Sequence, residues 1–149
     1  MRKVSSSTYL LDVNVLLALA WPNHQFHRAA RQRLESSGAR WATCALTQLG
    51  FIRLSSNPSV VGVVKSPSES ARLLSAMVSD ARHVYLNSLP EPASAQVVGA
   101  FRSLLGGRQV TDAYLLYLAG QNRATLLTFD SRLAALAPAS TSVEVLAPA

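Results

Sequence analysis

The chain carries near its beginning the stretch Tyr9-Leu10-Leu11-Asp12-Val13-Asn14-Val15-Leu16-Leu17-Ala18-Leu19. Its first apolar residues are few enough for a buried strand, and the longer apolar run that follows predicts a helix. A carboxylate stands at the junction, where an ionised group that loses water needs hydrogen bonds, a cation or the edge of a cleft. Asp12 or Asn14 acting as the cap of the helix would meet this need without any function.

Length and composition predict the class of protein. The 149 residues, 49% of them hydrophobic, with a single cysteine, are typical of one globular domain spanning residues 1–149 without a disulfide framework. The chain opens without a secretory leader and has no apolar run long enough for a membrane span, so we expect a cytoplasmic protein with no membrane partner. The net charge of +6, carried mostly by arginine, favours a polyanionic partner.

Short apolar segments alternate with helix-like segments along the whole chain. We expect strands at 9–11, 40–44, 84–86, 125–128 and 143–146, and helices after 11 and at 24–37, 45–55, about 68–82, 90–105, 111–119 and 131–137. Residues 59–67 are expected to be irregular or extended. The alternation predicts an α/β three-layer sandwich, in which helices cover both faces of a short, mostly parallel sheet of about five strands.

Three of the eight acidic residues stand at related positions. Asp12 follows the first strand, Asp130 follows the strand at 125–128, and Asp112 begins a helix after a glycine turn. In an open α/β sheet, the carboxyl ends of strands and the facing helix starts line the crevice where ligands bind. The three carboxylates are therefore expected to converge on one cleft.

Each acid also has a purely structural explanation. Thr111 can cap its helix while Asp112 favours the helix dipole, and Asp130 can cap the helix that starts at Ser131. Helix capping does not require that three carboxylates meet, however, and clustered carboxylates repel unless a cation neutralises them. A site built from a few oxygen ligands favours Mg²⁺ or Mn²⁺, which keep several waters and also bind phosphate oxygens.

Four segments together resemble a known family. Leu-Leu-Asp12-Val-Asn14, the run from Thr43 to Arg53, Thr111-Asp112-Ala-Tyr-Leu and Thr128-Phe-Asp130 occur in the order seen in PIN-domain proteins. The similarity is greatest to the VapC-type ribonuclease toxins of bacterial VapBC modules, and it covers nearly the whole chain.

The resemblance implies a metal-dependent endoribonuclease, the toxin of a type II toxin–antitoxin system. It also implies a VapB-type antitoxin that blocks the cleft, and a homodimer. Asp12, Asp112 and Asp130 match the family's acidic positions and are the expected metal ligands, while Asn14 and Thr128 match polar residues that support them. With Gln48 they form the expected catalytic set.

Gln48 departs from the family pattern, because many PIN domains have a glutamate at this second acidic position. A carboxamide can offer its carbonyl oxygen to a metal or bond a metal-bound water, but it has no charge and is not a base. One metal is therefore expected, and a second is left open. The substitution also keeps open a rival function, a catalytically weak or inactive module that binds RNA or an antitoxin.

The leading hypothesis is hydrolysis of an RNA phosphodiester. Asp12 and Asp112 would hold Mg²⁺, with Asp130 completing the site directly or through water, and the ion would polarise the phosphate and activate a water. Arg28, Arg31, Arg53 and Arg108 are the candidate RNA contacts. A phosphotransfer or receiver domain is a third possibility, but it would normally present an acid pair and a lysine at strand ends, and the only lysines are Lys3 and Lys65.

Overall fold

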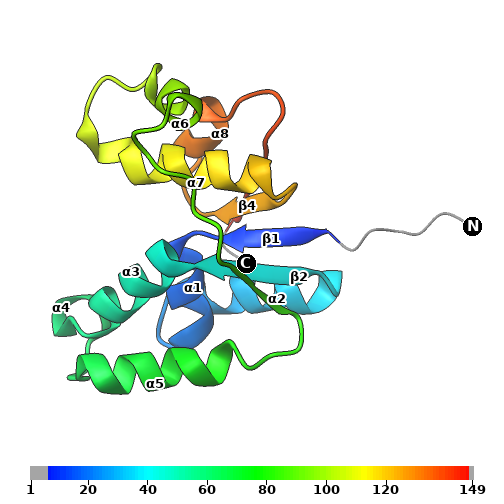
Figure 1. Cartoon of the computed structure of the whole chain (residues 1–149). Helices are drawn as coiled ribbons and strands as arrows, with labels where there is room; N and C mark the ends of the chain where they lie inside the picture. Colours follow the sequence, from blue (N-terminus) through cyan, green and yellow to red (C-terminus); the bar gives the residue numbers. More distant parts are fainter. Residues whose placement is uncertain (1–6, 148–149) are drawn as a thin grey trace, which may run out of the picture.

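Five parallel strands form one sheet through the middle of the molecule (Figure 1). This computed structural model describes residues 7–147. The strands are β1 (Thr8–Leu11), β2 (Arg40–Cys44), β3 (His83–Leu86), β4 (Thr125–Thr128) and β5 (Ser142–Val145). Their spatial order is β3-β2-β1-β4-β5, and all four pairings are parallel. The α/β sandwich with a short parallel sheet, predicted from the alternation of segments, is confirmed.

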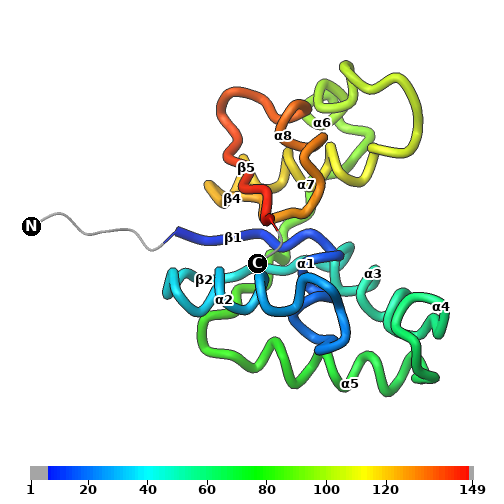
Figure 2. Tube along the Cα trace, turned by 180° about the vertical axis from the view of Figure 1, so that it is seen from behind, coloured from blue at the N-terminus to red at the C-terminus, as the bar shows by residue number. Residues whose placement is uncertain are grey.

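Helices cover both faces of the sheet, as Figures 1 and 2 show from opposite sides. One layer holds α1 (Val13–Ala20), α2 (His27–Ser37), α3 (Ala45–Ser55), α4 (Pro58–Val61) and α5 (Pro67–Met77). The other holds α6 (Ala95–Val98), α7 (Val110–Gln121) and α8 (Arg132–Leu136), with 3-10 turns at Gly99–Phe101 and Gly107–Gln109. Within residues 7–147, none of the helices has the length and apolar character needed to cross a membrane.

The opening stretch of the chain is buried because β1 is the central strand. Successive side chains of a strand point to opposite faces, so Leu10 packs in the cluster that contains Leu115 and Leu126, while Leu11 packs with Leu16 and other residues of the opposite layer. Leu10 and Leu11 are both fully buried. A continuous apolar run is what a strand covered on both faces requires.

The chain changes direction across the sheet at β1. From β1 the chain adds β2 and β3 on one side, and later β4 and β5 on the other. The carboxyl ends of β1 and β4 therefore lie at the switch point of the sheet, where the connections leave toward opposite faces and where open α/β sheets generally bind ligands. Asp12 lies at this point, and its backbone N–H donates to the carbonyl of Leu127, 3.0 Å away.

Several element boundaries differ from the expectation. The helix predicted at 24–37 begins at His27, because His24 accepts a hydrogen bond from the backbone of Phe26 in a preceding turn. Residues 59–67 are not all irregular, since the Asn57 side chain caps the short helix α4. The helix predicted at 68–82 ends at Met77, and the one predicted at 90–105 is reduced to α6 and a 3-10 turn.

Candidate carboxylate site

Asp12 caps α1 and is also the most buried acid of the site. Its Oδ1 accepts from the backbone N–H of Val13 at 2.8 Å, and its Oδ2 accepts from the hydroxyl of Thr128 at 2.7 Å. The residue is 9% exposed. Burial raises the pKa of Asp12 above its ordinary value, although the two hydrogen bonds act in the opposite direction. The capping explanation therefore holds for Asp12, and the cap stands at the switch point of the sheet.

Thr128 connects the ends of β1 and β4. Its side chain is fully buried, and its hydroxyl donates to Asp12 while accepting from the backbone N–H of Asp130 at 3.1 Å. A hydroxyl suits this position because its single oxygen can donate and accept at once. It sets the position of Asp12 and of the chain that carries Asp130.

Asp112 brings the third carboxylate from the opposite helical layer. It lies in the first turn of α7 and is half-buried. Burial raises the pKa of Asp112, and the negative charges of Asp12 and then Asp130 raise it further. The three acids are therefore within electrostatic reach of one another. The cap predicted at Thr111 is wrong, since Gln109 occupies the N-cap position of α7 and makes no side-chain cap bond.

Asp130 differs from the other two acids because an arginine holds it. The guanidinium of Arg132 donates from Nε to Oδ1 at 3.0 Å and from Nη2 to Oδ2 at 2.9 Å, and the backbone N–H of Arg132 donates to Oδ1 at 3.0 Å. The hydrogen bonds from Arg132 hold the pKa of Asp130 below its ordinary value. Asp130 thus makes a side-chain bond at the start of α8, although Ser131 is the formal N-cap.

The connection from β4 to α8 is braced by aromatic side chains. The ring of Phe129 stacks on Phe26 with centroids 4.5 Å apart and on His24 at 6.0 Å. Both partners come from the turn between α1 and α2. Because Phe129 stands between Thr128 and Asp130 in the chain, this stack fixes the backbone that presents the acid. Sequence reasoning did not single out Phe129 or Arg132, although an arginine two residues after an acid at a helix start is a detectable signal.

Gln48 is engaged with the neighbouring strands. It is half-buried on α3, and its Nε2 donates to the hydroxyl of Thr43 at 3.0 Å. Thr43 also bonds Nε2 of His83 at 2.7 Å. Among residues 7–147, no hydrogen bond joins Gln48 to Asp12. The role expected of Gln48 toward a metal stays a prediction.

Asn14 lies apart from the hydrogen-bond network of the acids. Its side chain is exposed and lines a hollow of about 140 Å³ together with Asn23 and His24. In the described part of the chain, no hydrogen bond connects it to Asp12 or Thr128. Its predicted supporting role is untested.

The donor set fits one hard divalent cation. Mg²⁺ is commonly held by one or two carboxylates, waters and substrate phosphates, and Asp12 and Asp112 supply two mutually repelling carboxylates that a cation would relieve. Between residues 7 and 147, no group of three His, Cys, Asp or Glu side chains has the geometry to hold a metal ion. This agrees with Asp130 being bound by Arg132. Among the three acids, Asp130 is the one that an arginine holds within residues 7–147, so the acceptors left for a cation are mainly those of Asp12 and Asp112.

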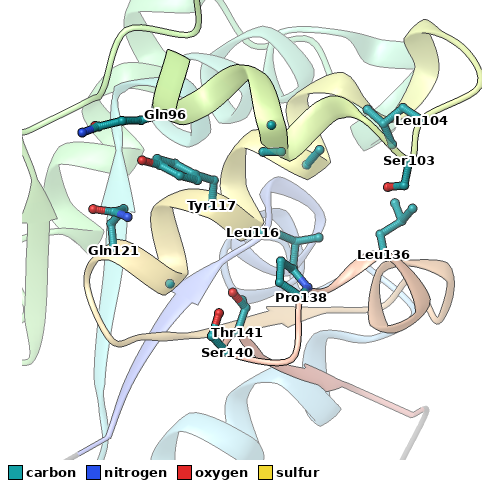
Figure 3. A pocket seen from close by; sticks show the side chains of 14 residues that line it. Gln96, Ser103, Leu104, Leu116, Tyr117, Gln121, Leu136, Pro138, Ser140 and Thr141 are labelled. Atoms are coloured by element: carbon teal, nitrogen blue, oxygen red, sulfur yellow. The ribbon is translucent and has the colours of Figure 1, made fainter. Parts of the chain in front are cut away.

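A separate cavity of about 360 Å³ lies against α7 (Figure 3). Its lining comes from α6, the 3-10 turn at Gly99–Phe101 and the residues just after it, α7, α8 and the segment before β5. It includes Gln96, Ser103, Tyr117, Gln121 and Thr141. None of its lining residues is acidic. The cavity is thus distinct from the carboxylate site and offers uncharged polar groups only.

Comparison with known proteins agrees with this arrangement. The family model described as PIN domain matches residues 9–138. Ribonuclease VapC39 of Mycobacterium tuberculosis is 42% identical over 142 residues, covering 93% of this chain and 99% of the relative. Ribonuclease VapC38 of the same organism is 38% identical over 140 residues, covering 92% and 96%.

A solved structure has the same fold at low sequence identity. The crystal structure of VapBC2 from Rickettsia felis bound to a DNA fragment from its promoter aligns with a TM-score of 0.62 and 14% identity, covering 94% of this chain and 99% of the matched one. The fold is therefore shared across a wide sequence distance. With a family model that spans most of the residues and relatives of this similarity, the chain belongs to the PIN-domain family.

Proposed function

We propose that this protein is a metal-dependent endoribonuclease, the toxin of a type II toxin–antitoxin system, which hydrolyses RNA phosphodiester bonds with one Mg²⁺ or Mn²⁺. The observation that carries the proposal is that Thr128 joins Asp12 to the chain carrying Asp130 where β1 and β4 end, with Asp112 within electrostatic reach. Relatives named ribonuclease, which match more than nine-tenths of the chain, support the reaction class.

The environment of each side chain suggests its role in the reaction. Asp12 and Asp112 would hold the ion, which when bound supplies Lewis acidity for the phosphate and lowers the pKa of a water. Thr128 keeps the Asp12 carboxylate oriented through its 2.7 Å bond. Asp130 adds negative charge at the rim, so it would contribute directly or through water. The beginning of α7 favours the phosphate's charge through the helix dipole.

RNA cleavage by purified protein tests the proposal. We expect a panel of structured RNAs to be cut in the presence of Mg²⁺ or Mn²⁺, with EDTA abolishing the cutting. Asp12→Asn and Asp112→Asn should each slow it by about 100-fold or more, because a metal contributes several kcal/mol to the transition state. Glu35→Gln, at an exposed acid of α2, is the matched control. Undiminished cutting in EDTA, or by Asp12→Asn, would contradict the mechanism.

The substrate in this proposal is RNA, attracted by the excess of positive charge. Arg28, Arg53 and Arg108 are exposed, and Arg108 lies in the turn just before α7 and its Asp112. Arg31 is also exposed but is paired with Glu35 at 2.9 Å. Arg108 is therefore the candidate contact nearest in the chain to a site carboxylate.

The proposal includes two protein partners, a VapB-type antitoxin and a second copy of this chain. An apolar groove of about 290 Å³ supports the presence of a protein-binding surface; it is lined by Leu46, Leu89, Pro90, Pro92, Phe101, Val110, Thr111 and Tyr114. Exposed apolar patches of this kind commonly bind proteins. A solution mass from light scattering that equals one chain would contradict the homodimer.

We also propose a cytoplasmic location, which suits the single free, buried Cys44.

The relatives named ribonuclease do not favour the rival function, a binding module without catalysis, whose support is the carboxamide of Gln48 at the family's common glutamate position. RNA binding that survives Asp112→Asn, with no cleavage of any RNA tested, would support this alternative. Gln48→Glu sharpens the comparison, because it restores the family's common acid. If the natural protein cleaves no RNA and Gln48→Glu does, Gln48 is the cause of the missing activity.

A further inference from the structure

While Arg132 binds Asp130, few acceptor positions of this carboxylate are free to bind a metal. An ionised carboxylate has about four acceptor positions. Arg132 fills three of them, two on Oδ1 and one on Oδ2. The planar guanidinium fork, which meets both oxygens, is the geometry that makes arginine–carboxylate pairs specific. The one acceptor position that remains is on Oδ2, so a metal that binds both oxygens of Asp130 must displace this side chain.

The charge of Arg132 acts on more than its own partner. Its positive charge also lies within electrostatic reach of Asp112. The guanidinium thus partly neutralises two of the three acids, which is what a bound cation would do. The guanidinium of Arg132 and a divalent cation repel each other, so binding of the ion to Asp130 opposes binding of the guanidinium.

We propose that Arg132 is a built-in counter-ion that competes with the divalent metal for Asp130 and moves into solvent when the metal binds. The proposal rests on the metal dependence proposed above. The side chain of Arg132 is 73% exposed and that of Asp130 is 29% exposed. Exposed pairs of this kind are weak, so water readily replaces the contact. The arginine therefore lowers the metal affinity of the site without blocking it.

The decisive measurement is the affinity for Mn²⁺, obtained by isothermal titration calorimetry of the metal-free protein. Arg132→Gln removes the guanidinium and keeps the backbone N–H that bonds Asp130. We expect it to bind Mn²⁺ about two- to fivefold more tightly than the natural protein, the range that the strength of an exposed ion pair allows. Arg31→Gln is the matched control, because Arg31 binds Glu35 through the same two nitrogens on the surface of α2. It should bind Mn²⁺ like the natural protein.

A second measurement follows the arginine itself in the unmodified protein. The ¹H–¹⁵N signal of the Arg132 side-chain Nε should shift on saturation with Mg²⁺, while that of Arg31 should stay in place. Equal or weaker Mn²⁺ binding by Arg132→Gln would overturn the competition while leaving the metal dependence intact, as would an unmoved Arg132 signal. Absence of Mn²⁺ binding by both proteins would instead overturn the metal dependence, and the competition with it.

Discussion

At the scale of single residues, Thr128 is the group on which the geometry of the site depends most. Its buried hydroxyl bonds both Asp12 and the backbone of Asp130. Thr128→Val keeps the shape but leaves a buried acceptor and a donor without partners. We expect the free energy of unfolding at pH 7 to fall by about 1–3 kcal/mol, measured by urea denaturation.

The same substitution should change the titration of Asp12. The hydrogen bond from Thr128 lowers the pKa of Asp12 against the effect of burial, so its loss should raise that pKa further in an NMR titration. Thr125→Val, at the half-buried first residue of β4, is the control and should leave the pKa of Asp12 unchanged. An unchanged titration in Thr128→Val would contradict the role assigned to the hydroxyl.

The acids of the site should have opposite effects on the pH dependence of stability. The pKa of Asp112 is raised by folding, so this group stabilises the fold below its unfolded pKa, and that contribution is lost as the pH rises through the folded pKa. Metal-free Asp112→Asn should therefore melt at a higher temperature than the natural protein at pH 7. The advantage should shrink as the pH falls toward about 3.9, the unfolded value.

Asp130→Asn is the internal comparison. The pKa of Asp130 is lowered by folding, so its stabilisation is present above the unfolded pKa and is lost as the pH falls through the folded pKa. This variant should melt at a lower temperature than the natural protein at pH 7. If both variants shifted the melting temperature in the same direction, the electrostatic description of the site would be wrong.

At the scale of elements, α1 and α3 pack tightly together beside the site. A Cβ added to Gly50 would stand 2.9 Å from Cγ2 of Val13, the residue that follows Asp12. Overpacking costs about 1–3 kcal/mol, which exceeds the gain of up to about 1 kcal/mol from replacing glycine by alanine in a helix. Gly50→Ala should therefore lower the free energy of unfolding by up to about 2 kcal/mol and slow RNA cleavage by displacing the cap of α1.

Gly99 provides the matched control for this prediction. A Cβ at Gly99 meets nothing within 4 Å, and its backbone has ordinary helical angles. Gly99→Ala should leave cleavage unchanged and keep or slightly raise the free energy of unfolding, by up to about 1 kcal/mol. Equal effects of the two alanines in urea denaturation would show that helix spacing at Gly50 has no special importance.

At the scale of the whole molecule, the net charge of +6 should govern how the protein meets RNA. Each phosphate neutralised by a basic side chain releases counterions, so binding weakens as salt rises. For about three such contacts, an increase from about 50 to 200 mM salt should weaken RNA binding by roughly 20- to 40-fold. Fluorescence polarisation with the Asp12→Asn variant separates binding from cleavage. Salt-independent binding would argue against the exposed arginines as RNA contacts.

The sequence alone determined the architecture and the approximate place of the acids. Strands and helices follow from local periodicity, and β2 and α3 have the bounds that the pattern predicts, because apolar spacing is a property of neighbouring residues. The family motif likewise indicated Asp12, Asp112 and Asp130. Short, weakly patterned segments were misjudged, as between residues 90 and 105, where contacts with other elements outweigh local preference.

Only the tertiary structure decided how those acids are partnered. It joins Thr128 to Asp12 across 116 positions of the chain, ties Gln48 to Thr43, and gives Asp130 to Arg132. The hydrogen-bond partners of each acid depend on strand order and on the direction in which each side chain leaves the backbone. Local sequence spacing encodes neither of these. The burial that raises the pKa of Asp112 has the same origin, because it depends on the packing of α7 against a sheet assembled from distant segments.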